Sequence, residues 1–138
     1  KEYRRQRQMC IRDSGNGGDT FKIALFTSSA SLGAATTVYS TSNEISGTGY
    51  SAGGATLTNT GVGLDSTTAF TDFSDVSFTS ASFTANGCLI YNTTMAGGTG
   101  TTNAVCAVAF GGDKTVSSGT FTIQFPTNDA SSAIIRLT

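Results

Sequence analysis

The sequence predicts an all-β domain, an antiparallel two-sheet β-sandwich of the jelly-roll or immunoglobulin-like kind with about eight strands. Three observations lead to this prediction. Apolar residues alternate with other residues at a period of two in most apolar runs, a pattern that lines one face of a strand. Those runs are rich in Thr, Phe, Val and Ile, which suit a pleated, half-buried surface. Clusters of Gly, Asn, Ser and Asp separate the runs, as turns do.

The first strand is expected at residues 20–27, where Phe21, Ile23 and Leu25 occupy alternate positions. Residues 33–42 follow and are predicted as a short helix or a turn. Ala34 and its neighbour Ala35 favour a helix there, whereas the Ser, Thr and Val around them weaken it.

The later strands follow the same alternation, which is clearest in Phe121, Ile123 and Phe125. Pro126 ends that run, because proline has no N–H to give to a neighbouring strand. Residues 127–131 are predicted as a turn held by side-chain-to-backbone hydrogen bonds, before an apolar last strand that must pair within a sheet. The strands expected after the first are 55–64, 67–73, 75–79, 82–92, 103–110, 119–126 and 132–138.

Residues 1–18 are interpreted as a non-native or disordered extension, and residues 19–138 as a single β-sandwich domain. The first fourteen residues hold five of the eight cations of the chain, and residues 3–14 resemble a translated sequencing adapter. The alternative for this segment is a basic arm that grips nucleic acid or an anionic lipid surface. The domain itself has three cations against seven acids, hence a formal charge of −4.

Composition narrows the function. The chain has no His, which excludes a Ser-His-Asp triad, a Cys-His pair and a His-ligated metal. The formal net charge of −1 argues against a nucleic-acid binder. Apolar runs are far shorter than the roughly 20 residues that a membrane-spanning helix needs. We therefore expect no enzymatic activity, no catalytic residues, no cofactor, no metal, and neither a nucleic-acid nor a membrane partner.

The core is expected to be small. Apolar residues make up 38% of the chain, below the usual share of about 45–50%. Nine Phe and four Tyr partly compensate, because aromatic side chains bury a large area each. A domain with such a core is expected to gain stability from its neighbours through oligomerisation.

Two glycine-rich segments resemble nucleotide-binding motifs and are assigned to loops instead. Residues 47–52 match G-x-G-x-x-A, but a dinucleotide site needs a strand before that motif and a helix after it. Residues 112–115, Gly-Asp-Lys-Thr, lack the glycine directly before the lysine that a phosphate loop requires. We expect a flexible loop at the first segment and a hairpin turn at the second.

Asp72 and Asp75 suggest either a carboxylate pair, a Ca²⁺ site, or solvated or capping carboxylates, and we expect the last. Cys88 and Cys106 lie on two candidate strands that would bring the sulfurs together if they pair. A disulfide is one outcome, and two small thiols in the core are the expected one. Cys10 belongs to the extension. Four aromatic residues form either a stripe that binds sugars or, as we expect, sheet core: Phe78, Phe83, Tyr91 and Phe110.

A set of short motifs runs through residues 19–138: Thr20–Thr27, Asn43-Glu44, Ser46–Tyr50, Ala52–Gly54, Phe83–Ala85, Gly87, Leu89–Asn92, Phe110–Thr115, Phe121–Ile123, Phe125–Ala130 and Ala133–Arg136. As a set they resemble a family of small Ser/Thr/Gly-rich virion structural proteins of tailed bacteriophages that is common in metagenomes. None of the motifs is catalytic. The chain departs from the family in carrying Cys88 and Cys106 where small apolar residues are expected.

This resemblance implies a component of the virion that is assembled in the host cytoplasm: a head decoration protein, a neck or tail part, or a fibre-associated module. Its partners would be other virion proteins and further copies of itself. The alternative is a carbohydrate or host-surface binding β-sandwich module that takes a host-surface glycan. That alternative calls for an exposed groove carrying Tyr39, Tyr50 or Tyr91 beside an Asp or Asn.

Overall fold

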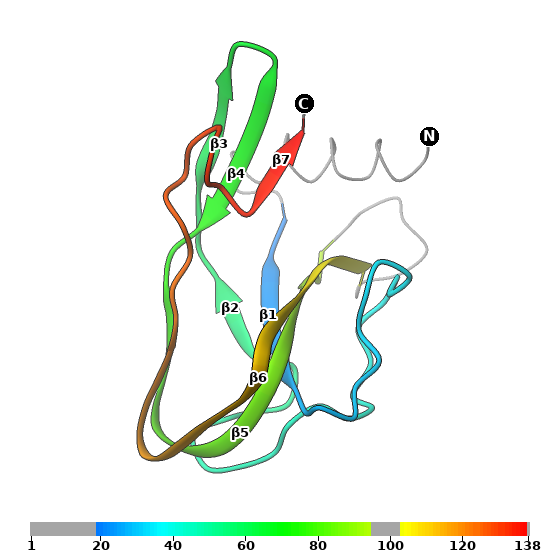
Figure 1. The fold of residues 1–138 in the computed structure, drawn as a ribbon, viewed down its shortest axis with the longest axis vertical. Helices are drawn as coiled ribbons and strands as arrows, with labels where there is room; N and C mark the ends of the chain where they lie inside the picture. Colours follow the sequence, from blue (N-terminus) through cyan, green and yellow to red (C-terminus); the bar gives the residue numbers. More distant parts are fainter. Residues whose placement is uncertain (1–18, 95–102, 138) are drawn as a thin grey trace.

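The computed structural model describes residues 19–94 and 103–137 and has the predicted all-β architecture (Figure 1). Two antiparallel sheets, one of four strands and one of three, contain all of its regular structure, with no helix in these two ranges. The extension predicted for residues 1–18 lies outside the described residues. The antiparallel two-sheet β-sandwich expected from the sequence is confirmed, with seven strands.

The larger sheet has the strand order β2-β1-β5-β6. Its members are β1 (Phe21–Phe26), β2 (Ala55–Leu57), β5 (Val76–Asn92) and β6 (Asn103–Ile123). β1 lies in the middle because it pairs with both β2 and β5, in registers that place Phe21 opposite Leu57 and Asn92. β5 and β6 form a long, bent pair that reaches from Asn92 opposite Asn103 to Val76 opposite Ile123.

The smaller sheet has the order β3-β4-β7. β3 (Asn59–Asp65) and β4 (Thr68–Phe73) form a hairpin, and β7 (Ile135–Leu137) pairs with β4. This hairpin extends past the end of the larger sheet, at the opposite end of the molecule from the bend in β5 and β6 (Figure 1).

The strands break or merge differently from the prediction at three places, and two strands are shorter than expected: β6 ends at Ile123 instead of 126, and β7 begins at Ile135 instead of 132. The strand expected at 55–64 breaks at Thr58, where the chain leaves the larger sheet for the smaller one. The strands expected at 75–79 and 82–92 are one strand, and so are those expected at 103–110 and 119–126. Positive φ at Gly111, Gly112 and Ser118 produces bulges in β6 instead of turns.

The helix considered at 33–42 is absent, and its alternative, a turn, is present. Residues 33–35 form a turn closed by a hydrogen bond from the Thr36 N–H to the Gly33 carbonyl, 3.0 Å long. Val38 then forms an isolated bridge to Asn103 on β6. The Ser, Thr and Val content that weakens a helix favours this extended path.

The main core lies between the two sheets. β1 contributes Phe21, Ile23 and Leu25 to it, which confirms the alternation predicted for this strand. The remaining buried apolar members are Ile45, Leu57, Phe73, Phe78, Ala81, Phe83, Ala85, Cys88, Ile90 and Ile135.

A second apolar layer covers the outer face of the larger sheet. Ala24 and Phe26 of β1 and Leu89 and Tyr91 of β5 point into it and are buried. The long connection from β1 to β2, residues 27–54, packs over them through Ala30, Leu32 and Tyr39. The two central strands of the sheet are therefore covered on both faces.

Candidate functional site

Glu44 is the centre of a hydrogen-bond network in the 27–54 connection. Its Oε2 accepts from the Tyr39 hydroxyl at 2.6 Å. Its Oε1 accepts from the Tyr50 hydroxyl at 2.6 Å and from the Gly53 N–H at 2.7 Å. One half-buried carboxylate thus holds three groups that are distributed over this connection.

Tyr91 joins this network from β5. Its ring stacks on Tyr39 with centroids 4.4 Å apart and planes 8° from parallel, and its hydroxyl donates to the Gly53 carbonyl at 2.6 Å. The Tyr50 hydroxyl also accepts from the Leu25 N–H at 2.9 Å. We call Glu44, Gly53 and these three tyrosines the tyrosine network, and it fastens the connection to β1 and β5.

The tyrosines of the network are held in their protonated form. Burial, followed by the hydrogen bond and the negative charge of Glu44, raises the pKa of Tyr39 and of Tyr50 well above the ordinary value. Burial and the Glu44 charge likewise raise the pKa of Tyr91. The three residues considered for a sugar-binding groove therefore have their hydroxyls engaged inside the protein.

Asp72 and Asp75 cap backbone groups, as expected, and both of them bind the segment 124–134. Asp72 is buried, and its two oxygens accept from the Phe73 N–H at 2.8 Å and the Ile134 N–H at 3.1 Å. Asp75 accepts from the Phe125 N–H at 2.8 Å. Burial raises the pKa of Asp72, and the negative charge of Asp75 adds to the effect. Together they tie both ends of the 124–134 segment to β4 and to the β4–β5 connection.

Cys88 and Cys106 lie on paired strands and are not joined by a disulfide. The register places Cys88 opposite Val108 and Cys106 opposite Ile90, so the two cysteines are offset by two residues along the strands. Burial, with the neighbouring Cys106, raises the pKa of the Cys88 thiol to about 12. The expectation of two thiols associated with the core agrees with this arrangement.

The two glycine-rich segments have different outcomes. Residues 47–52 form a loop with Gly49 at φ +78°, as expected. Residues 112–115 do not form a hairpin turn: they continue β6, with Lys114 opposite Ala85. That prediction was wrong because a glycine with positive φ is compatible with a bulge as well as with a turn.

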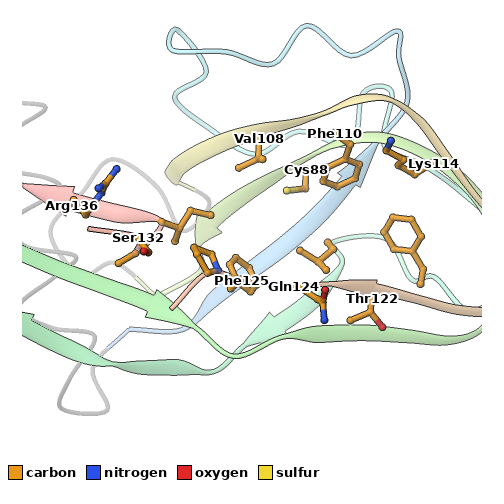
Figure 2. Close-up of a pocket in the computed structure, with 14 residues that line it drawn as sticks. Cys88, Val108, Phe110, Lys114, Thr122, Gln124, Phe125, Ser132 and Arg136 are labelled. Atoms are coloured by element: carbon orange, nitrogen blue, oxygen red, sulfur yellow. The ribbon is translucent and has the colours of Figure 1, made fainter. Parts of the chain in front are cut away.

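Phe78, Phe83 and Tyr91 are buried, as expected for sheet core. Phe110 is half-buried and lines a cleft of about 760 Å³ on the open side of the sandwich. Figure 2 shows the cleft between β6 and the 124–134 segment, with Phe110 on one side and Phe125 across from it. The other lining residues are Cys88, Val108, Lys114, Phe121, Thr122, Ile123, Gln124, Pro126, Ser132, Ala133, Ile134 and Arg136. We call this the β6–β7 cleft.

The cleft exists because both sheets end there. β6 and β7 are the edge strands of their sheets, and the 124–134 segment crosses from one edge to the other without adding a strand. Half-buried apolar side chains of β6 consequently face open space instead of a second layer. Only the assembled sheets reveal this, because the lining residues come from separate strands whose order the sequence does not state.

The two charged side chains that line the cleft are both cations. Backbone hydrogen bonds lower the pKa of Asp129, and Arg136 lies near enough for its charge to add to this effect. Of the three cations in the described part of the chain, Lys114 and Arg136 line the cleft and Lys22 does not. The cleft-lining residues within the described ranges include no carboxylate. A cationic, apolar cleft therefore lies on a domain whose formal charge is −4.

Within residues 19–94 and 103–137, no three His, Cys, Asp or Glu side chains come together as a metal site would require. No helix long and apolar enough to cross a membrane is found in the same ranges. Comparison of the chain with protein-family models, with curated proteins and with solved structures found no match.

Proposed function

We propose that this chain is a non-enzymatic structural subunit of a tailed-bacteriophage virion that works by packing against neighbouring subunits. Its place is in a head decoration, in the neck or tail, or beside a fibre. The phage assignment rests on the motif set in the sequence. The packing role is supported by the β6–β7 cleft, an apolar opening of about 760 Å³ between two edge strands.

The use of the polar side chains also supports a packing role. Asp72 and Asp75 hold backbone N–H groups of the chain itself, and Glu44 holds tyrosine hydroxyls. A general acid or base has to reach a substrate, whereas these carboxylates are directed to internal partners. The exposed apolar side chains Val38, Val62 and Leu64 and the β6–β7 cleft remain available for contacts with other molecules.

The proposal is tested by the mass of the full chain in solution, measured by sedimentation velocity over a wide concentration series. A defined oligomer or a growing filament is expected, because assembly depends on protomer concentration. A monomer at every concentration counts against packing between copies of this chain. The virion assignment is tested on intact phage particles purified in a density gradient. Peptides of this chain are expected among the proteins of the particles, and their absence would contradict the assignment.

The alternative, a carbohydrate-binding module, relies on Tyr39, Tyr50 and Tyr91. Tyr91 is buried, and the hydroxyls of all three are hydrogen-bonded within the tyrosine network. This favours subunit packing over the carbohydrate-binding module. Specific binding on a glycan array, lost in a Tyr39→Ala variant that stays folded, would reverse that order.

A further inference from the structure

The β3–β4 hairpin carries an exposed apolar face with an acid beside it. Val62 and Leu64 of β3 are 41% and 73% exposed. The register puts Leu64 in line with Ala69 of β4 and half-buried Leu137 of β7, on one face of the smaller sheet. Asp65, exposed, follows directly at the end of β3. An apolar patch at the end of a projecting element marks a contact surface more strongly than scattered exposed apolar residues do.

The β6–β7 cleft has the complementary properties. Its walls include Phe110, Phe121 and Phe125, which supply apolar surface. Its charges are Lys114 and Arg136, and no carboxylate is among the cleft residues in the described ranges. The hairpin is thus convex, apolar and acidic where the cleft is concave, apolar and basic. Complementary charge of this kind orients two surfaces and excludes wrong partners.

An added strand is a poorer occupant of this cleft. Positive φ at Gly111, Gly112 and Ser118 interrupts the regular extended backbone of β6 with bulges. Bulges and lysines on an edge strand oppose pairing with a further strand. The middle part of the β6 edge is therefore protected against strand addition, and side-chain insertion into the cleft is the mode that remains.

The hairpin cannot enter the cleft of its own chain. β4 pairs with β7 through Ala69 opposite Leu137, and residues just before and within β7 line the cleft, namely Ser132, Ala133, Ile134 and Arg136. Turning the hairpin inward would break this pairing. Figure 1 shows the hairpin directed away from β5 and β6.

We propose that the β3–β4 hairpin of one copy inserts into the β6–β7 cleft of the next, with Leu64 against the cleft aromatics and Asp65 near Lys114. The interface joins two different surfaces, so it is head-to-tail and closes into a ring or continues as a filament. This inference rests on the proposed packing function and names its partner, a second copy of the chain.

The test uses full-length chains in sedimentation velocity at physiological ionic strength. The hairpin variant Leu64→Ser with Asp65→Asn loses the inserted Leu and the charge pair, and the cleft variant Lys114→Glu places two carboxylates together. Each is expected to weaken self-association at least about tenfold. Val38→Ser is the matched control, because Val38 is 52% exposed and lies outside both surfaces. Lys114→Arg is expected to retain assembly. Circular dichroism confirms that each variant is folded.

Mixing decides the geometry. The hairpin variant keeps an intact cleft and the cleft variant keeps an intact hairpin, so an equimolar mixture is expected to form dimers that stop at two copies. Asp65→Lys combined with Lys114→Glu in one chain is expected to restore assembly through the reversed pair. Unchanged assembly in the hairpin variant, or a mixture that stays monomeric, would overturn the insertion while leaving the packing function in place. A wild-type chain that is monomeric throughout would overturn the insertion and packing between copies, whereas absence of the chain from phage particles would overturn the virion assignment.

Discussion

Removal of the Glu44 carboxylate is expected to weaken the fold strongly. In Glu44→Ala, the hydroxyls of Tyr39 and Tyr50 and the N–H of Gly53 all lose their acceptor. A hydrogen bond to a charged group contributes about 1.5–3 kcal/mol, and a half-buried site lies at or below the lower end of that range. At about 1 kcal/mol each, the three bonds give a loss of roughly 3 kcal/mol, a large part of the stability of about 5–15 kcal/mol that is typical of a domain.

The assay is urea unfolding followed by circular dichroism and tyrosine fluorescence. With a slope near 2 kcal/mol per molar urea, a loss of this size lowers the midpoint by roughly 1.5 M. Glu44→Gln keeps one acceptor oxygen and is expected to lose about half as much free energy. Ser42→Ala, an exposed neighbour whose hydroxyl has no bond to the network, is the control and is expected to stay within about 0.5 kcal/mol of wild type.

The reasoning is refuted if Glu44→Ala unfolds within about 0.5 kcal/mol of wild type, the range of an ordinary surface substitution. That result would mean that water replaces the carboxylate without cost and that the 27–54 connection is held by apolar packing alone. Equal losses in Glu44→Ala and Glu44→Gln would instead show that the charge, and not the number of acceptors, stabilises the connection.

Four further outcomes are expected. Because the pKa values of the network tyrosines are raised, the folded state binds more protons than the unfolded state above about pH 10. Stability is intact below that pH and falls above it by up to about 4 kcal/mol per pH unit. Tyrosinate absorbance and circular dichroism, measured together, are expected to show ionisation that coincides with unfolding. Asp72→Ala leaves two backbone N–H groups without an acceptor and is expected to lose about 2–4 kcal/mol in urea unfolding; a loss below that range would contradict its capping role. Gly54→Ala is expected to yield little folded protein, since φ is +71° and a Cβ would collide with a β1 carbonyl, whereas Gly33→Ala, with open space around it, is expected to express and melt as wild type. Burial raises the pKa of the Cys88 thiol to about 12. In a chain whose other two cysteines are replaced by Ala, Cys88 is therefore expected to react with iodoacetamide at pH 8 only at the rate of unfolding. Fast labelling of the folded chain would show that the thiol is accessible.

Local patterns carried much of the fold. Period-two alternation places Phe21, Ile23 and Leu25 in the core, as predicted. The turn at 127–131 is also confirmed, because Asp129 accepts from the Ser131 and Ser132 N–H groups at 2.8 and 2.7 Å. Both features are determined by residues that are close together in the sequence, so local patterns are sufficient to predict them.

Features that depend on distant residues were not predicted. Nothing near Glu44 in the sequence indicates that it binds the hydroxyls of Tyr39 and Tyr50, since the segment has no periodicity that would orient it. The continuous β6 was missed for a related reason: Gly111 and Gly112 are typical of turns, and only the pairing with β5 shows that the strand continues through them. The β6–β7 cleft, in turn, follows from which strands lie at the sheet edges.

The position of β1 has a consequence for how the chain folds during synthesis. β1 is made first among the strands, yet its neighbours β2 and β5 come later, and the smaller sheet is complete only when β7 at residues 135–137 is available. Pairings this distant in sequence close slowly. A growing chain on the ribosome therefore holds an unpaired β1 edge until β5 has emerged at Asn92, and an unpaired β4 edge until β7 emerges. A chain that terminates before β7 is expected to aggregate through the exposed β4 edge instead of forming a smaller stable domain.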